Sequence, residues 1–176
     1  MIIRETPLPG VTIIEPELIR DERGWFARTF AAAEFEAAGL EPAVVQCNLS
    51  FNARAGTLRG MHYQADPYSE CKLVRCTRGG LYDVALDLRR ESPTYLSWHA
   101  LELTAENRLA LYIPRGLAHG FQTLADETEV YYQMSQPYVA SAANGVRWDD
   151  PAFGIVWPEG ERTISERDLS YLDFEP

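Results

Sequence analysis

Short segments rich in β-branched and aromatic residues recur about every ten residues along most of this chain, separated by proline, glycine, asparagine and aspartate. This spacing is typical of all-β domains, in which each segment is a strand and each interruption a turn. The candidate strands span residues 11–19, 43–51, 71–77, 81–88, 95–104, 108–114, 119–125 and 128–135. The pattern predicts a β-sandwich, a jelly roll or a barrel, and does not distinguish among them.

Local patterns add detail to this prediction. The segment 81–88 alternates regularly, which places its side chains on two faces of a strand. One face carries Tyr82, Val84, Leu86 and Leu88, and the other carries Asp83 and Asp87. Only residues 30–40 have helical composition, with Gly39 as the stop signal. Pro16 marks an edge or a bend within 11–19.

The chain has the length of one compact domain, so we expect a single domain over residues 1–176. Its apolar fraction of 46% and charged fraction of 24% are those of a globular protein. The acidic chain end is the exception, and we expect it to be loosely held from about residue 170.

The formal net charge of −10 discourages nucleic acid and anionic membranes as partners. It leaves room for a phosphate-bearing ligand if the binding site is locally basic. The first residues lack the apolar core of a signal peptide, and no apolar run reaches the length of a membrane span. Cys47, Cys71 and Cys76 have no zinc-binding or CxxC spacing, which predicts reduced thiols in a cytoplasmic protein.

The sequence contains only three histidines, and each is a candidate for proton transfer near neutral pH. His62 follows a glycine turn in the motif LRGMHYQ, with Arg59 three residues earlier and Lys72 ten residues later. His119 lies at a strand entry bounded by proline and glycine, whereas His99 has no polar neighbours in its segment. His62 therefore has the neighbourhood best suited to a catalytic base.

A catalytic histidine needs an acceptor that orients its second ring nitrogen. For His62 the candidates are Asp83, on the following strand, and Asp168, near the chain end; the sequence does not choose between them. Tyr132 is a candidate proton donor, because strand alternation places it on the inward face with Val130 and Met134.

A metal site is the competing interpretation of the same histidines. Metal-binding barrels typically carry an HxH pair on one strand, but Gln64 follows His62 at that spacing and Phe121 follows His119. We therefore expect no metal.

Seven motifs in a fixed order carry a family resemblance: LRGMHYQ, KLVRC, YDVALDLR, SPTY, LYIPRGLAHGF, VRWDDPAFGIVWP and SERD. Together they resemble the dTDP-4-dehydrorhamnose 3,5-epimerase family, the RmlC-like cupin sugar-nucleotide epimerases, from about residue 3 to about residue 170. The resemblance implies an all-β fold, a cupin-type jelly-roll β-barrel with one or a few short helices. It also implies a homodimer with exchanged N-terminal strands and no metal or cofactor.

The resemblance assigns roles to individual residues. It implies that His62 is the catalytic base, Asp168 its partner and Tyr132 the proton donor of the opposite face, while Lys72 stabilises an enolate. The implied substrate-binding residues are Arg59, Arg23, Gln46, Asn48, His119 and Tyr138, with Arg23 contributed across the dimer. The implied reaction is epimerisation at C3, C5 or both of a nucleoside-diphosphate 4-keto-6-deoxyhexose in deoxysugar biosynthesis.

The chain departs from the family pattern near the expected nucleotide base. Cys47 and Leu49 replace the first and third residues of a common DNHS motif. Arg28 stands where relatives commonly have glutamate, and Ile19 where an aromatic is common. Exchanging a carboxylate for a guanidinium reverses charge and hydrogen-bonding character. The alternatives for the nucleotide therefore include thymidine, cytidine, guanosine and uridine diphosphates, and the role of Arg28 is open.

Three other activities compete with epimerisation. A metal-dependent cupin isomerase or dioxygenase is disfavoured by the missing HxH pair, and a non-catalytic sugar-nucleotide-binding cupin by the intact set of base, acid and donor. A ketoisomerase that moves the carbonyl between C3 and C4 is the nearest rival, since it uses the same proton transfers.

Overall fold

Short β-strands dominate the computed structural model, which describes residues 1–175. The helices in this range are α1 (Ala32–Ala37) and α2 (Glu166–Leu169). The strands, in chain order, are β1 (Ile2–Glu5), β2 (Thr12–Glu15), β3 (Ile19–Asp21), β4 (Gly24–Phe26), β5 (Gln46–Asn52), β6 (Thr57–Gln64), β7 (Lys72–Arg78), β8 (Gly80–Asp87), β9 (Trp98–Thr104), β10 (Ala110–Ile113), β11 (Leu117–Thr123), β12 (Thr128–Met134), β13 (Ala143–Gly145) and β14 (Thr163–Ile164).

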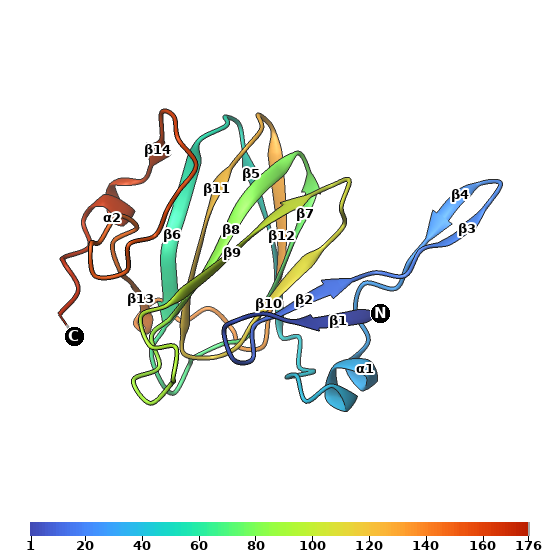
Figure 1. Ribbon diagram of the computed structural model, residues 1–176, viewed down its shortest axis with the longest axis horizontal. Helices are drawn as coiled ribbons and strands as arrows, with labels where there is room; N and C mark the ends of the chain where they lie inside the picture. Colours follow the sequence, from blue (N-terminus) through green and yellow to red (C-terminus); the bar gives the residue numbers. More distant parts are fainter. Residues whose placement is uncertain (176) are drawn as a thin grey trace.

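Two large sheets lie face to face and form a jelly-roll barrel (Figure 1). One sheet has the strand order β1-β2-β10-β7-β12-β5. The other has the order β13-β6-β11-β8-β9, with β14 added parallel to β6. Strands that are neighbours in a sheet, such as β5 and β12, are often distant in the chain. The prediction of an all-β jelly roll with a few short helices is confirmed.

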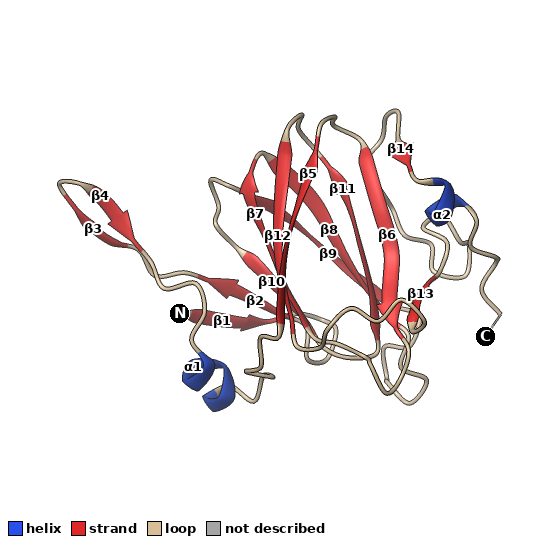
Figure 2. Ribbon diagram, turned by 180° about the vertical axis from the view of Figure 1, so that it is seen from behind, coloured by secondary structure: helices blue, strands red, loops and turns tan. Residues whose placement is uncertain are grey.

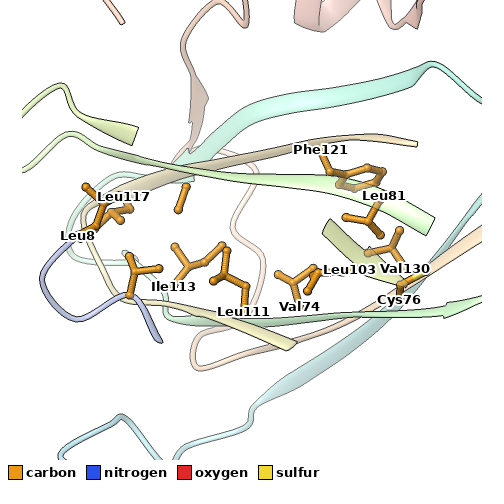
Figure 3. Packing of buried hydrophobic residues seen from close by; sticks show 12 residues of the cluster. Leu8, Val74, Cys76, Leu81, Leu103, Leu111, Ile113, Leu117, Phe121 and Val130 are labelled. Carbon is orange, nitrogen blue, oxygen red and sulfur yellow. The ribbon is translucent and has the colours of Figure 1, made fainter. Parts of the chain in front are cut away.

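Apolar side chains from both sheets fill the barrel interior beside β8, β9 and β10 (Figure 3). Val74 of β7, Leu111 of β10 and Val130 of β12 meet Leu81 of β8 and Leu103 of β9 there, and all five are fully buried. Burial of this kind is the main favourable contribution to folding. Because the core occupies this side of the barrel, the side between β5 and β6 is free to hold a polar cavity.

Most of the strands predicted from sequence are present. Seven of the eight candidate segments coincide with β5 and with β7 to β12, and the segment 11–19 is interrupted after Pro16, between β2 and β3. The predicted helix is shorter than residues 30–40, and Gly39 follows it with a φ of +72° as a stop residue does. The exception is β6, which continues through Gly60 where the sequence indicates a turn.

The alternation predicted for 81–88 is confirmed, but both faces of β8 are buried. Val84 and Leu86 pack into an outer apolar layer with Phe153 and Trp157, which follow β13 in the chain. The opposite face of β8 looks into the barrel, where Asp83 is fully buried. The sheet is therefore covered on both sides, and the carboxylates of β8 lie inside the protein rather than in solvent.

A hairpin of β3 and β4 projects from the barrel near the N-terminus (Figures 1 and 2). Its large side chains are exposed in the single chain: 67% of the Ile19 surface, 49% of Trp25 and 66% of Phe26. The guanidinium of Arg108 lies over the Trp25 ring at 4.8 Å from its centroid. An extended arm with this much exposed apolar surface is typical of a segment that packs against another protein surface.

The C-terminal segment, which the composition predicts to be loosely held, makes several contacts with the loop after β13, although most of its residues are exposed. Asp173 Oδ1 accepts a bond from Arg147 Nη1 at 2.7 Å, and Phe174 N donates to Asp150 Oδ2 at 2.6 Å. The Phe174 ring lies 5.1 Å from that of Phe153, in the outer apolar layer. The acidic end is held because its charges and its aromatic ring find partners in the loop after β13.

Two further expectations concern the whole chain. Cys47, Cys71 and Cys76 are free thiols. Within residues 1–175, no helix combines the length and the hydropathy required to cross a membrane.

Candidate active site

A cavity of about 920 Å³ opens between the two sheets on the side bounded by β5 and β6. Side chains of β5, β7 and β12 form one wall, and side chains of β6 and β11 form the facing wall. Residues around α2 close one side. The predicted site residues that line the cavity are Gln46, Asn48, Arg59, His62, Lys72, His119, Tyr132, Tyr138 and Asp168.

β6 places Arg59 and His62 on the same wall, although a spacing of three residues puts side chains on opposite faces of a regular strand. β11 pairs His119 with His62 but Phe121 with Arg59, so the register shifts between these two pairs. Such a bulge re-aims side chains. Gly60 lies at the shift with a φ of +138°, and a Cβ there would lie 2.5 Å from the backbone of β11. The close approach therefore requires glycine.

His62 is bonded to Asp168, with 2.6 Å between His62 Nε2 and Asp168 Oδ1. The second carboxylate oxygen, Oδ2, accepts a bond from Gly60 N at 3.2 Å. Asp168 N in turn donates to Ser165 Oγ at 3.1 Å, and Ser165 is the N-cap of α2. The Asp168 side chain is buried while that of His62 is 38% exposed, so the carboxylate lies behind an imidazole that reaches the cavity.

The carboxylate determines which nitrogen of His62 carries the hydrogen. Burial raises the pKa of Asp168, but its hydrogen bonds to His62 and Gly60 hold the pKa below the usual 3.8. An ionised carboxylate only accepts hydrogen bonds, which assigns the hydrogen to Nε2 of His62. The lone pair then lies on Nδ1, the nitrogen available to take a proton from a ligand.

His119 has a different carboxylate, with 2.7 Å between His119 Nε2 and Asp83 Oδ1. Both side chains are buried, and they come from the neighbouring strands β11 and β8. Of the two carboxylates that the sequence leaves open for His62, Asp168 is therefore its partner, and Asp83 is the partner of His119.

Tyr132 lies on the wall that faces His62. β12 pairs Tyr132 with Asn48 of β5 on one side and with β7 on the other. Val130 and Met134 are buried beside it, and the inward orientation predicted from alternation is confirmed. Burial raises the pKa of Tyr132, against a smaller lowering by the charge of Arg59. The phenol consequently keeps its proton at neutral pH and is available as a donor.

Two basic side chains, Lys72 and Arg59, line the cavity among the predicted residues. Lys72 Nζ lies 3.0 Å from the backbone oxygen of His62 and 3.0 Å from Glu70 Oε1. Arg59 Nε donates to Asn52 Oδ1 at 2.8 Å, which holds the guanidinium from one side. Together with Arg167, these two residues face the carboxylates of Glu70 and Asp168, so the cavity carries three basic and two acidic side chains in a chain whose net charge is −10.

A second group of predicted residues forms the rim. Gln46 Nε2 donates to Asn48 Oδ1 at 3.0 Å, and Gln46 Oε1 accepts from Tyr138 N at 2.9 Å. These bonds tie β5 to the segment after β12, so the amides of Gln46 and Asn48 have a defined orientation at the cavity.

Arg23 is the predicted site residue that does not line the cavity of its own chain. It lies between β3 and β4 at the end of the projecting hairpin and forms an ion pair with Asp21. Its side chain is 86% exposed. Arg23 was predicted to be contributed across a dimer, and a single chain does not test that prediction.

The four residues that depart from the family pattern also lie largely outside the cavity. Arg28 Nη1 pairs with Glu34 Oε1 at 3.1 Å on the surface, and Ile19 is exposed on the hairpin. Cys47 is exposed on β5, whereas Leu49 lines the cavity. The positive charge that Arg28 introduces is therefore paired with Glu34 of the same chain.

Two charged residues of the cavity are absent from the sequence prediction. Glu70 precedes β7 and contacts Lys72, and Arg167 lines the cavity beside Tyr138. Arg167 directly precedes Asp168 in the motif SERD, which is a signal that the sequence does contain. Glu70 has no such signal, because only the turn into β7 brings its carboxylate inward.

No group of three or more histidine, cysteine, aspartate or glutamate side chains within residues 1–175 has an arrangement that could hold a metal ion. The two histidines of the cavity each use Nε2 on a single carboxylate instead. The two cavity histidines within residues 1–175 therefore form two separate histidine–carboxylate pairs.

Comparisons with known proteins identify the family of this chain. The family described as dTDP-4-dehydrorhamnose 3,5-epimerase matches residues 5–175. The dTDP-4-dehydrorhamnose 3,5-epimerase of Sinorhizobium fredii is 43% identical over 171 residues, which cover 97% of this chain and 88% of that protein.

Solved structures show the same similarity. The dTDP-4-dehydrorhamnose 3,5-epimerase of Elizabethkingia anophelis superimposes with a TM-score of 0.96 at 37% identity, covering 99% of this chain and 96% of that one. The dTDP-6-deoxy-D-glucose-3,5-epimerase RmlC of Legionella pneumophila, in complex with dTDP-4-keto-L-rhamnose, superimposes with a TM-score of 0.90 at 36% identity, covering 96% and 90%.

A jelly-roll barrel whose cavity holds an oriented histidine on one wall and a protonated tyrosine on the other defines a cupin-type acid–base enzyme. Matches over nearly the whole chain, in sequence and in structure, identify the family within this class of enzymes. The chain belongs to the dTDP-4-dehydrorhamnose 3,5-epimerase family.

Proposed function

We propose that this protein is an isomerase that epimerises a nucleoside-diphosphate 4-keto-6-deoxyhexose at C3, C5 or both, in deoxysugar biosynthesis. The observation that carries the proposal is the placement of an oriented base, His62, and a proton donor, Tyr132, on facing walls of one cavity. Inversion of a carbon centre requires removal of a proton on one face and its return on the other. Facing walls supply these two groups.

The chemistry of the substrate explains why one base is sufficient for two centres. A ketone at C4 acidifies the hydrogens at both C3 and C5, since loss of either gives an enolate on the same oxygen. In this proposal His62 Nδ1 takes the proton and Tyr132 returns one from the opposite face. Lys72, with His119, stabilises the negative oxygen as it develops. The oxidation state of the sugar is unchanged, so the reaction requires no redox cofactor.

The diphosphate of the substrate needs cations that bind oxygens in pairs, which guanidinium groups do best. Arg59 and Arg167 both line the cavity and are suited to this role. We assign Gln46, Asn48 and Tyr138 to the nucleotide-sugar, since their polar groups lie at the rim.

We propose a thymidine nucleotide as the preferred substrate. Of the departures, Cys47 does not line the cavity of its own chain, and the charge of Arg28 is paired with Glu34. The Legionella pneumophila relative is known in complex with dTDP-4-keto-L-rhamnose. Leu49 is the departure that lines the cavity, and an apolar side chain there adds no donor that selects against thymine.

We further propose a homodimer in which the N-terminal arms are exchanged. The hairpin of β3 and β4 exposes Ile19, Trp25 and Phe26 in the single chain, and Arg23 lies at its end. Contact with a second copy would bury this surface and deliver Arg23 to the partner's cavity. The free thiols of the chain support a cytoplasmic location.

The decisive experiment incubates the protein in D₂O with a panel of dTDP-, CDP-, GDP- and UDP-linked 4-keto-6-deoxyglucoses and follows deuterium by NMR. We expect incorporation at C3, C5 or both with the thymidine compound, together with inverted product. Deuterium at one carbon defines a single epimerase and at both a double one. A carbonyl moved to C3 without inversion would identify a ketoisomerase, and no incorporation with any member would refute the proposed function.

A further inference from the structure

Four polar side chains on the cavity walls share one arrangement, because each contacts a side-chain oxygen on its far side. The pairs are His62 with Asp168, His119 with Asp83, Arg59 with Asn52, and Lys72 with Glu70. Preorganised groups of this kind stabilise developing charge without having to reorient during the reaction. In the last pair both partners carry a charge and both side chains are almost completely buried.

The contacts of Lys72 leave its ammonium group with a defined direction. An ammonium has three N–H donors. Here one N–H donates to the backbone oxygen of His62 at 3.0 Å, and the ammonium forms an ion pair with Glu70, with 3.0 Å between Nζ and Oε1. The hydrogen bond and the ion pair together restrict the orientation of the ammonium. Since Lys72 lines the cavity and its side chain is only 9% exposed, the remaining donor is the one a bound ligand can use.

The Glu70 side chain is almost completely buried, with 4% of its surface exposed. Its second oxygen, Oε2, has no hydrogen-bond partner among the described residues. A buried carboxylate without a full set of donors is unfavourable for folding. The ion pair with Lys72 compensates the Glu70 charge, and burial makes the attraction between the two charges strong.

We propose that Glu70 is a positioning residue for the epimerisation, which acts through Lys72 and aims the third N–H of the ammonium at the C4 oxygen of the substrate. This inference rests on the proposed function. Lysine is a long and flexible side chain, and a single contact to a backbone oxygen leaves it free to rotate. The carboxylate supplies the second contact.

A double-mutant cycle tests whether Glu70 acts through Lys72. Glu70→Leu should lower kcat for deuterium exchange roughly 10- to 100-fold with KM for the dTDP sugar little changed, as loss of a supporting partner does. Glu70→Gln, which retains an acceptor oxygen, should recover part of that loss. In a Lys72→Met background, Glu70→Leu should have no further effect. Losses that multiply in the double variant would overturn the proposal.

A second readout separates this inference from the proposed function and from misfolding. In ¹⁵N-lysine-labelled protein, the Lys72 ammonium should give a ¹H–¹⁵N signal protected from solvent, and Glu70→Leu should lose it while the circular dichroism spectrum stays native. The exposed Glu91→Gln is the matched control and should retain both signal and activity. A protected signal that survives in Glu70→Leu overturns the inference even if the wild type is active. An inactive wild type with the expected signals refutes only the function.

Discussion

His62 and His119 lie directly opposite each other on β6 and β11, yet their carboxylates come from different parts of the molecule. Asp83 is on β8, beside β11, and two residues along from the direct partner of His119, so strand register alone brings the two together. Asp168 lies on α2, 106 residues after His62 in the chain. One pair is part of the barrel wall, and the other exists only when the C-terminal segment is in place.

The C-terminal segment that carries Asp168 is attached to the barrel by contacts of Tyr171, Asp173 and Phe174. Behind His62, the ring of Tyr171 lies at 6.3 Å between centroids, and a Cβ at Gly145 would collide with it. Asp173 and Phe174 tie the segment to the loop after β13. The wall pair is thus as stable as the barrel, while the pair at the chain end can be opened by changes far from the cavity.

The largest expected effect is a difference in deuterium exchange between variants of His62 and variants of His119. His62→Ala removes the proposed base and should lower deuterium exchange at C3 and C5 by roughly 10²- to 10⁴-fold or more. His119→Asn should slow exchange but leave it measurable, since the role proposed for His119 is only to support the enolate. Solvent exchange followed by NMR gives both rates. Exchange at the wild-type rate in His62→Ala would show that the base is misassigned.

The two carboxylates come next. Asp168→Asn presents an amide donor to Nε2 of His62, which favours the tautomer with its hydrogen on Nδ1 and removes the basic nitrogen from the cavity. We expect kcat to fall roughly 10²-fold, and Asp83→Asn to cost about tenfold. Steady-state kinetics with the dTDP sugar compare the variants. Equal losses would mean that the two pairs share one role.

Tyr132→Phe probes the opposite wall and should uncouple two rates that are linked in the wild type. The phenyl ring keeps the packing but cannot return a proton, so epimerisation should fall roughly 10²-fold. Deuterium incorporation with retention should fall less, because His62 can still remove and return a proton on its own face. Parallel loss of both rates would argue against Tyr132 as the donor.

A smaller effect is expected from the anchor of the chain end. Phe174→Ala removes the contact with Phe153 without touching the cavity. We expect kcat to fall by less than about tenfold, since the supporting bond between Asp168 and His62 weakens but is not lost. Amide hydrogen exchange should accelerate over residues 166–174 and not in β8 or β11. Acceleration throughout the barrel would indicate global destabilisation instead.

The smallest expected effect is on stability at low pH. The pKa of Asp168 is lower in the folded chain than its usual 3.8, so the ionised carboxylate stabilises the fold above that pH. This contribution is lost as the pH falls below 3.8 and through the folded-state value. Urea unfolding at pH 7 and pH 3 should therefore show a larger decrease for the wild type than for Asp168→Asn. Identical decreases would indicate that the bond contributes little.

Part of this site was predictable from local pattern. Tyr132 was expected to face inward with Val130 and Met134, and it does, because the two-residue period of a strand is a local property. The positions of Arg59 and His62 on one wall were not expected, since a bulge at Gly60 breaks that period. The buried carboxylate of Glu70 was not expected either, because a turn gives no periodic signal.

The sequence by itself determined the all-β class, most strand positions and, through its ordered motifs, the family and the candidates for its chemistry. The family resemblance implied Asp168 as the partner of His62, but only the tertiary structure showed that Asp83 is bonded to His119 and that Glu70 contacts Lys72 inside the cavity. The physical reason is the separation along the chain of the residues that interact. Strand formation and facing depend on neighbours along the chain, whereas a hydrogen bond across 106 residues depends on how the closed barrel receives the chain end.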